Sequence, residues 1–298
     1  MEVTVIGGPA SAEQARRLAV ELGAEYVPVE HKLFPDGESY LRFVADLKGR
    51  CVVVFQGTHP PQDRNLLQLL MISKTARERG ASRVLAVVPY LAYARQDREF
   101  LQGEVVSIRV VLHAMRCAGV DALLTVNPHS PWALEAGGLE SIQVDVTKLL
   151  ARKAAESHGP FDVVGSPGKK GRSMAEAAAE EIGAVPFHLV SSRDPMTGKV
   201  EVRVDGLDVA GKRVLLIDDI ISTGGTMADA VRGLLRSGAR EVIVSCVHGL
   251  FVGDAVERLL GAGASALIST DTVPSHHSRV SVVSELAKAV GAWASAKR

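Results

Sequence analysis

Short runs of Val, Ile and Leu alternate along the chain with longer amphipathic stretches. Buried parallel strands read as continuous apolar runs, and the crossover helices that join them carry one apolar face, so this alternation predicts an α/β fold. We expect strands at residues 2–6, 51–56, 83–89, 122–127, 162–166, 213–218, 241–247 and 266–270. The clearest helices are expected at residues 12–22, 65–79, 107–117, 174–182, 227–237 and 255–260.

The predicted elements repeat about halfway along the chain. Residues 76–88 and 233–245 each read as a helix end, a Gly-Ala turn and a strand. A chain of 298 residues is longer than one hydrophobic core usually serves, since domains commonly have about 150 residues. We therefore expect two similar domains, residues 1–145 and 146–298, with the last segment able to pack back on the N-terminal domain. Chance similarity of two βα units is the alternative.

Charge and composition narrow the class of protein. The 34 Lys and Arg residues balance 34 Asp and Glu residues, which argues against a nucleic-acid binder built on bulk positive charge. Hydrophobic residues make up 47% of the chain and charged residues 23%, as is typical of a globular protein with an aliphatic core. No apolar run approaches the ~20 residues of a membrane-spanning helix, and the first residues lack a basic segment before an apolar one. We therefore expect a cytoplasmic protein.

The three cysteines, Cys51, Cys117 and Cys246, lie far apart and form no Cys-x-x-Cys pair. This spacing argues against a disulfide framework or a structural zinc site. Because each cysteine lies in or beside an apolar stretch, we expect buried and unreactive thiols.

The segment with the most chemical information is Val214-Leu-Leu-Ile-Asp-Asp-Ile-Ile-Ser-Thr-Gly-Gly-Thr226. It reads as a buried strand, two acids at the strand end, a Thr-Gly-Gly-Thr loop and then a helix. Ligands of open parallel sheets bind at the carboxyl ends of strands, and a glycine-rich loop that opens a helix offers backbone N–H groups to a phosphate. Paired acids beside that anion suit ribose hydroxyls or a phosphate-bound Mg²⁺. A tight turn with a solvated acid pair is the alternative.

This segment closely resembles the phosphoribosyl-pyrophosphate loop of the type I phosphoribosyltransferase fold. Further stretches resemble the ribose-phosphate pyrophosphokinases, in particular those of the archaeal type. They are Phe34-Pro-Asp-Gly-Glu-Ser-Tyr40, Pro89-Tyr-Leu-Ala-Tyr-Ala-Arg-Gln-Asp-Arg98, Gly103-Glu-Val-Val-Ser-Ile-Arg109 and Val126-Asn-Pro-His129. The resemblance covers nearly the whole chain and implies an α/β protein with two similar phosphoribosyltransferase-like domains, each a mainly parallel sheet flanked by helices.

The resemblance implies that the N-terminal domain binds most of the ATP. In the family, the turn at residues 34–38 reaches across a subunit interface to the adenine, and the histidine of Asn-Pro-His contacts Mg²⁺ or an ATP phosphate. Residues 99–104 would form part of a mobile catalytic flap. Without the resemblance, these stretches read as a turn, a solvated charge run and a surface histidine. The ATP-binding candidates are Phe34, Asp36, Glu38, Arg95, Gln96, Asp97 and His129.

The same resemblance implies that the C-terminal domain binds ribose 5-phosphate. The glycine-rich loop would hold the 5-phosphate, and the two acids would bind the ribose hydroxyls. The candidates are Asp218, Asp219, Ser222, Thr223, Gly224, Gly225 and Thr226. The implied cofactor is Mg²⁺, with His129 and Asp218 as its candidate ligands.

Two positions depart from the family pattern. The chain has Gly168 where the family has an aspartate near the ribose, and Ser191 where it has a lysine, so only Arg193 of a Lys-x-Arg pair remains. Losing one donor to developing charge costs about 10²- to 10³-fold in rate. Lys169 and Lys170 would take over this charge, or they are simply two lysines on an exposed turn. The catalytic candidates are thus Arg193, Lys169 and Lys170.

The implied reaction is attack by the 1-hydroxyl of ribose 5-phosphate on the β-phosphorus of ATP, which gives phosphoribosyl pyrophosphate and AMP, with Mg²⁺ holding the polyphosphate. The shared ATP site implies a homo-oligomer, a dimer or larger, and neither a nucleic acid nor a membrane is expected as a partner. Two other readings stay open. One is a weakened or inactive regulatory paralogue, because of Gly168 and Ser191. The other is a phosphoribosyltransferase, for which a single such domain suffices.

Overall fold

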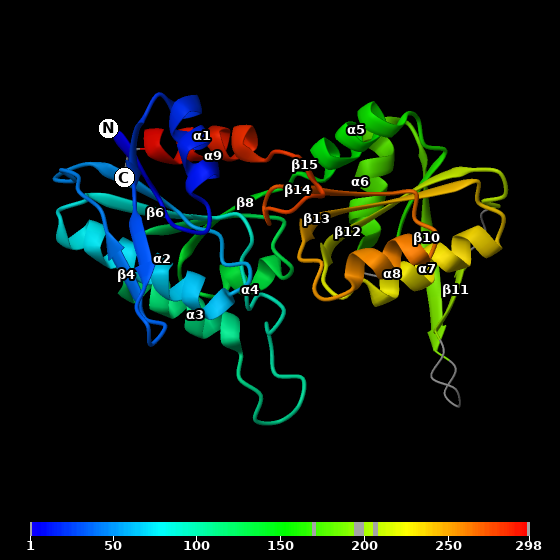
Figure 1. Cartoon of the computed structure of the whole chain (residues 1–298), viewed down its shortest axis with the longest axis horizontal. Coiled ribbons are helices and arrows are strands. Elements are labelled where there is room, and N and C mark those ends of the chain that lie inside the picture. The colour runs from blue at the N-terminus through cyan, green and yellow to red at the C-terminus, as the bar shows by residue number, and fades with distance from the viewer. Residues whose placement is uncertain (1, 169–170, 194–199, 205–207, 297–298) are drawn as a thin grey trace. The chain divides into compact units, whose positions relative to one another are not determined.

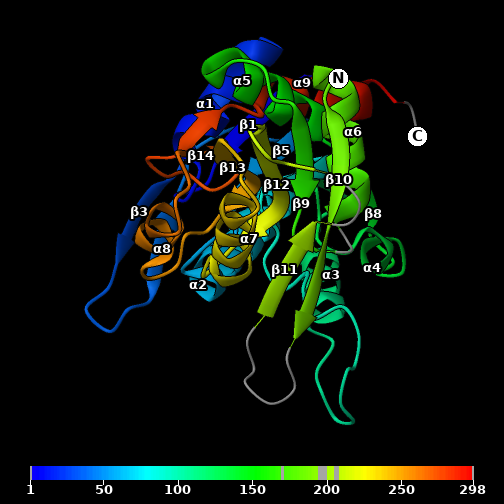
Figure 2. The ribbon, with the colours of Figure 1, turned by 90° about the vertical axis from the view of Figure 1, so that its right-hand side faces the viewer.

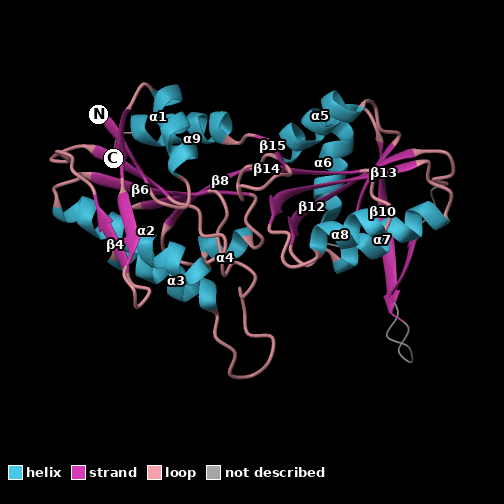
Figure 3. Cartoon of the chain, viewed as in Figure 1, coloured by secondary structure: helices cyan, strands magenta, loops and turns pink. Residues whose placement is uncertain are grey.

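The structure, a computed structural model, describes residues 2–168, 171–193, 200–204 and 208–296, with the backbone alone for 190–193 and 200–204. The chain divides into unit 1, residues 1–144 and 282–298, and unit 2, residues 145–281. Each unit is built on a largely parallel sheet with helices on both faces, as Figure 3 shows by its colours. The α/β class that the alternating pattern predicts is therefore confirmed.

Unit 1 holds a six-stranded sheet. Its elements are β1 (Val3–Gly7), α1 (Ala12–Leu22), β2 (Glu25–Pro28), β3 (Glu30–Leu33), β4 (Ser39–Arg42), β5 (Cys51–Phe55), α2 (Gln62–Glu78), β6 (Arg83–Val88), α3 (Ser107–Cys117), β7 (Ala122–Val126), α4 (Pro131–Glu135), β8 (Glu140–Val144) and α9 (Val283–Ser295). The sheet has the order β2-β1-β5-β6-β7-β8, and every neighbouring pair is parallel. Helices α1 and α9 cover one face and α2 and α3 the other (Figure 1). Strands β3 and β4 form a separate antiparallel hairpin beside α2.

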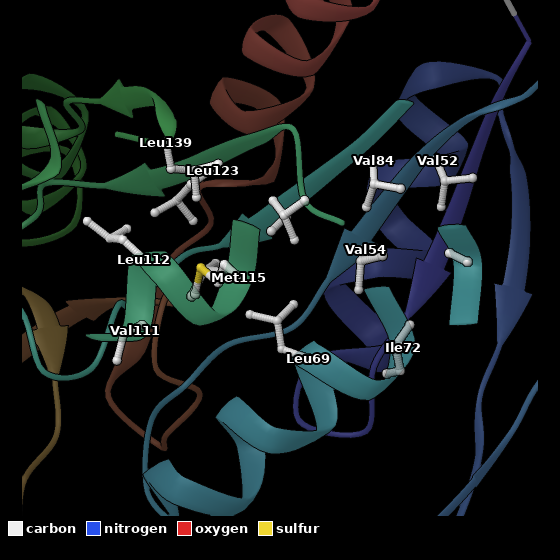
Figure 4. Packing of buried hydrophobic residues seen from close by; sticks show 14 of the residues in the cluster. Val52, Val54, Leu69, Ile72, Val84, Val111, Leu112, Met115, Leu123 and Leu139 are labelled. Carbon is white, nitrogen blue, oxygen red and sulfur yellow. The ribbon is translucent and has the colours of Figure 1, made fainter. Parts of the chain in front are cut away.

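Aliphatic side chains fill the space between this sheet and helices α2 and α3. Helix α2 buries residues at spacings of three and four along one face, as an amphipathic helix requires, and every second residue of β5 points to the same side. Each fully buried Leu, Ile or Met side chain contributes about 1.5–3 kcal/mol relative to exposure. Figure 4 shows the side chains that meet here, among them Val52, Val54, Leu69, Ile72, Val84, Leu112, Met115 and Leu123, all fully buried.

Unit 2 holds a seven-stranded sheet. Its elements are α5 (Thr147–His158), β9 (Val163–Ser166), α6 (Arg172–Ile182), β10 (Val185–Arg193), β11 (Val200–Val204), β12 (Arg213–Ile221), α7 (Gly225–Arg236), β13 (Glu241–Gly249), α8 (Ala255–Gly261), β14 (Ala266–Thr270) and β15 (Ser278–Val280). The order is β11-β10-β9-β12-β13-β14-β15. Among the described strands of this sheet, only the pair of β10 and β11 is antiparallel. Figure 2 shows β11 beside β10 at one edge of the unit.

The two units follow one plan. Elements β1, α1 and β2 correspond to β9, α6 and β10, and elements β5, α2 and β6 correspond to β12, α7 and β13. Helix α5 packs against α6, β14 and β15, and α9 packs in the same way against α1, β7 and β8. Because α5 follows β8 in the chain and α9 follows β15, the helix after the last strand of each sheet completes the other unit.

The element bounds agree with expectation in some places and differ in others. Helices α1 and α3 and strand β14 have the expected bounds. Strand β12 continues past the expected end at residue 218 to Ile221, so both acids lie inside the strand. Several elements were not expected from the sequence. They are helices α5 and α9, the β3–β4 hairpin, the β10–β11 pair and the short elements α4, β2, β8 and β15.

The expectation of three buried thiols is wrong for one of them. Cys51 and Cys246 are buried, and burial raises the pKa of both thiols. Cys117 is exposed, because the helical period of α3 turns Val111 and Met115 inward and its last residue outward. In the part of the chain that the structure describes, no helix has the length and apolar character to cross a membrane.

Trp293 attaches α9 to unit 1. Its side chain is 4% exposed, the guanidinium carbon of Arg83 lies 3.9 Å from the centre of its ring, and Arg83 Nη1 donates to the Trp293 carbonyl at 3.2 Å. We predict that Trp293→Ala destabilises unit 1 by about 3–5 kcal/mol, since a large buried aromatic is lost. Hydrogen exchange should become faster in α1 and β8 and stay unchanged in unit 2.

Trp132→Ala is the control for this prediction, because the Trp132 side chain is 46% exposed. A Trp293→Ala protein with the exchange rates of the control, or with equal acceleration in both units, would show that α9 is not part of the core of unit 1.

Candidate active site

Two acids lie at the carboxyl end of β12. Asp218 and Asp219 are half-buried, and each carboxylate accepts the next backbone N–H: Asp218 Oδ1 from Asp219 N at 3.0 Å and Asp219 Oδ1 from Ile220 N at 2.8 Å. These local hydrogen bonds orient both carboxylates at the edge of the sheet where ligands of parallel sheets bind.

Two side-chain oxygen atoms lie close to Gly171. Ser166, the last residue of β9, is 3% exposed, and its Oγ has no hydrogen-bond partner among the residues described. A Cβ atom at Gly171 would lie 1.8 Å from Ser166 Oγ and 3.7 Å from Asp218 Oδ1, so only glycine fits there. Ser166 was not among the residues selected from the sequence. Its signal was its place as the last residue of a predicted strand at the ligand edge.

The glycine-rich loop leads into helix α7 with its amide groups open. Gly224 has φ 72°, and a Cβ there would lie 3.3 Å from Leu259 Cγ, so glycine is required on both counts. No side chain caps α7, and its first turn carries no acidic residue. The first backbone N–H groups and the positive end of the helix dipole can therefore accept an anion, with the hydroxyls of Thr223 and Thr226 exposed beside them.

The loop after β13 supports this glycine-rich loop. Backbone N–H groups of Phe251 and Val252 donate to the carbonyls of Ile221, at 3.2 Å, and Ser222, at 3.0 Å. Gly249 has no room for a side chain, since a Cβ would lie 2.4 Å from the Phe251 ring. The connection between β12 and α7 is thus held from one side by the loop after β13.

In unit 1, the loop after β6 joins the loop after β7 through a buried acid. Arg95 and Gln96 are exposed, whereas the next residue, Asp97, is 2% exposed. The hydroxyl of Ser130 donates to Asp97 Oδ2, and Ser130 directly follows His129. The structure therefore brings the Arg95–Gln96 segment and the His129 segment to one edge of the sheet. Ser130 was missed from the sequence, because it lies 33 positions from its partner.

Two further side chains hold the loop after β6. Tyr93 has φ 66°, and its hydroxyl donates to Asp63 in the first turn of α2; this hydrogen bond raises the pKa of Tyr93. The hydroxyl of Ser107, the first residue of α3, donates to Gln96 Oε1. The loop is thus attached to both helices on that face of the sheet.

The expected flap, residues 99–104, closes on itself. Glu104 Oε2 accepts the backbone N–H of Phe100 at 2.9 Å and of Leu101 at 3.1 Å, and Glu99 accepts that of Gly103. The side chains of Phe100 and Leu101 are 61% and 70% exposed. The acids of this segment therefore satisfy its own amides and leave apolar side chains at its surface.

The turn of the β3–β4 hairpin presents its residues outward. Phe34 N donates to the Glu38 carbonyl at 2.8 Å, and Glu38 N donates to Asp36 Oδ1 at 3.2 Å. The Phe34 ring is 42% exposed and lies edge-on to Tyr40, with centroids 6.0 Å apart. An exposed ring in a polar turn is available for stacking on a base.

Two of the three catalytic candidates, Lys169 and Lys170, lie outside the described residues. Of Arg193 the backbone alone is described; it ends β10 and pairs with Val200 of β11. Gly168 is described, and among the described residues beyond its chain neighbours no atom would lie within 4 Å of a Cβ there.

The metal candidates do not form a protein cage. Among the described residues, no group of three or more His, Cys, Asp or Glu side chains is arranged to hold a metal ion. His129 belongs to unit 1 and Asp218 to unit 2. Mg²⁺ usually binds through one or two carboxylates together with substrate phosphates and water, so the Asp218–Asp219 pair fits this ion as part of a set that the substrate completes.

Comparison with protein families gives two matches along the chain. Residues 3–119 match the family described as the N-terminal domain of ribose phosphate pyrophosphokinase, and residues 138–258 match the phosphoribosyl transferase domain family. Both agree with the resemblance that the motifs indicated.

Similar proteins cover almost the whole chain. A ribose-phosphate pyrophosphokinase of Methanopyrus kandleri is 43% identical over 92% of this chain and 94% of its own, and one of Sulfurisphaera tokodaii is 38% identical over 94% and 96%. The crystal structure of a phosphoribosylpyrophosphate synthetase from Mycobacterium smegmatis matches with a TM-score of 0.88 and 29% identity, covering 98% of this chain and 99% of that one. These matches confirm the fold and the family expected from the sequence.

The link between Ser130 and Asp97 gives a stability prediction. Ser130→Ala leaves the buried Asp97 carboxylate without this hydrogen bond, which should cost about 1–3 kcal/mol in the free energy of unfolding of unit 1. Native-state hydrogen exchange at β6 and β7 measures this loss. Ser107→Ala, which removes an exposed hydrogen bond on the same loop, should cost less than about 0.5 kcal/mol. Equal effects of the two variants would refute a special role for the buried bond.

Proposed function

Because the chain belongs to the ribose-phosphate pyrophosphokinase family, we propose that it transfers the β,γ-diphosphoryl group of ATP to the 1-hydroxyl of ribose 5-phosphate. The products would be phosphoribosyl pyrophosphate and AMP. The protein would be a homo-oligomer, since in this family the hairpin turn of one subunit reaches the ATP of another. We also propose that it is cytoplasmic.

The observation that carries this proposal is the uncapped start of α7 beside two acids. A phosphate at Thr223–Thr226 would accept hydrogen bonds from the first N–H groups of the helix. Asp218 and Asp219 would then accept hydrogen bonds from the ribose hydroxyls. Ser166 Oγ, buried and without a partner among the described residues, lies beside Gly171 and near Asp218. A sugar that carries a phosphate matches both halves of this site.

In the proposed reaction one P–O bond forms and one breaks. The 1-hydroxyl oxygen bonds to the β-phosphorus, the bond from that phosphorus to the oxygen bridging to the α-phosphorus breaks, and AMP leaves with that oxygen. The hydroxyl proton passes to solvent. Because the hydroxyl oxygen attacks the phosphorus directly, no covalent enzyme intermediate is needed. Phosphoryl transfer of this kind depends on positioning and on cations that match the developing charge.

We assign the exposed residues of unit 1 to ATP. Arg95 would pair with phosphate oxygens through its planar guanidinium, Gln96 and His129 would contact the nucleotide, and Phe34 would stack on the base. Asp36 and Glu38 would hydrogen-bond to the base. Asp97 is buried, so we assign it to holding Ser130 beside His129 and not to direct contact with ATP.

The expected cofactor Mg²⁺ would neutralise polyphosphate charge when bound. Asp218 and Asp219 would supply oxygen ligands, and His129 of unit 1 is the further candidate ligand of the ion. Arg193, with Lys169 or Lys170, would face the transferred group in place of the family's Lys-x-Arg pair. These roles remain proposals carried by the family pattern.

The first test is incubation of the protein with ATP, Mg²⁺ and ribose 5-phosphate. AMP and phosphoribosyl pyrophosphate should form in equal amounts, and neither should form when ribose 5-phosphate is omitted. Binding of both substrates without AMP above background would identify a regulatory paralogue. Consumption of added phosphoribosyl pyrophosphate with release of diphosphate in the presence of a base would identify a phosphoribosyltransferase.

A second prediction concerns the missing acid. Gly168→Asp is expected to be tolerated, because a Cβ at this position has no neighbour within 4 Å among the described residues beyond the adjoining ones. If the carboxylate accepts a charge-assisted hydrogen bond from the sugar, kcat/KM for ribose 5-phosphate should rise about tenfold. Gly168→Asn has the same shape without the charge and should change kcat/KM less than about twofold. An equal rise in both variants would contradict a role for the charge.

A further inference from the structure

The β3–β4 hairpin needs support from the rest of unit 1. It is a two-stranded sheet of its own, and every residue of β3 is exposed. An isolated two-stranded hairpin is only marginally stable in water. Its turn is held internally by the hydrogen bonds between Phe34, Asp36 and Glu38, but those bonds do not fix the position of the turn relative to the main sheet.

One buried amide on α2 reaches both strands of the hairpin. Gln68 is 1% exposed; its Nε2 donates to Ser39 Oγ of β4 at 2.9 Å and lies 3.1 Å from His31 Nε2 of β3. The side-chain amide carries two hydrogens on this nitrogen, so it can serve both strands at once. Figure 1 shows the hairpin beside α2.

A second buried amide fixes the orientation of the first. Gln56, which directly follows β5 and is 0% exposed, donates from Nε2 to Gln68 Oε1 at 3.2 Å and to the Asn65 carbonyl at 3.2 Å. Its Oε1 accepts the backbone N–H of Ala10 at 3.0 Å. Since Gln68 Oε1 is the acceptor for Gln56, Gln68 Nε2 is the atom that faces the two strands of the hairpin.

The position of Gln56 corresponds to that of Asp218 in unit 2. Strands β5 and β12 hold equivalent places in their sheets, and each of these residues comes five positions after the first residue of its strand. In unit 2 the Asp218 carboxylate accepts the backbone N–H of Asp219. In unit 1 the Gln56 side chain accepts the N–H of Ala10, in the loop after β1, and Ser11 Oγ accepts that of Gly57, in the loop after β5, at 2.9 Å.

We propose that unit 1 uses the residue directly after β5, at the counterpart of the Asp218 position in β12, as an anchor for the hairpin. A continuous chain of hydrogen bonds runs from the Ala10 amide through Gln56 and Gln68 to Ser39 and His31. Gln68 and Gln56 are thereby positioning residues for the turn that carries Phe34, Asp36 and Glu38. The link to ATP binding rests on the proposed function; the anchoring itself does not.

The test compares Gln68→Leu with Gln62→Leu, the same substitution on the same helix. Leucine has about the volume of glutamine and removes both the donor and the acceptor. Gln68→Leu should speed hydrogen exchange of residues 30–42 in the free protein at least tenfold and leave β12 and α7 unchanged. It should also raise KM for ATP about tenfold while KM for ribose 5-phosphate stays within twofold. Gln62→Leu should change none of these quantities.

A variant on the hairpin side covers the case in which Gln68→Leu fails to fold. Ser39→Ala removes one of the two hairpin contacts without changing the buried helix face, so hairpin exchange should rise about threefold. Unchanged hairpin exchange in the folded variants overturns the anchor, and so does an equal rise of exchange throughout unit 1. Faster hairpin exchange with an unchanged KM for ATP upholds the anchor and refutes the hairpin's proposed role in ATP binding.

Discussion

The parallel arrangement of strands is the constraint on which the rest of this protein depends. Parallel strands end at one edge of a sheet, and the loops that follow them meet there whatever their distance in sequence. In unit 2 this brings Ser166, Asp218 and the start of α7 to one edge. In unit 1 it brings Asp97 to Ser130. The polar side chains that meet at this edge differ between the two units.

The two units differ in the groups that they place at the carboxyl edge of the sheet. The glycines before α7 leave its first N–H groups without a side-chain cap, which suits a phosphate. At the corresponding edge of unit 1, Gln56 accepts the Ala10 N–H and links through Gln68 to the hairpin, and Ser11 accepts the Gly57 N–H. One plan thus carries a glycine-rich loop beside two acids in unit 2 and an anchored hairpin in unit 1, which we propose as the sugar-phosphate and nucleotide sites. Gly168 and Ser191, where the sequence departs from the pattern expected of the family, lie in unit 2.

Sequence reasoning found what is local and missed what is distant. The central strands of both sheets and the loop after β12 were predictable, because their apolar runs, acids and glycines are adjacent in the chain. The expected strands correspond to β1, β5, β6, β7, β9, β12, β13 and β14. The hairpin was not, because its short strands are largely exposed and carry no apolar alternation. Gln68 could not be selected either, since a polar residue in a helix reads as solvent-facing until its buried partners are known. The same limit applied to Ser130 and its hydrogen bond to Asp97.

The most direct test of this account is titration of the isotope-labelled protein with ribose 5-phosphate, followed by amide nuclear magnetic resonance. The amide signals of Thr223–Thr226 should shift as the phosphate binds at the start of α7, whereas those of Ala10 and Gly57 should stay in place because Gln56 and Ser11 already occupy them. Shifts confined to Ala10 and Gly57, with the amides at 223–226 unmoved, would contradict the division of roles between the two units.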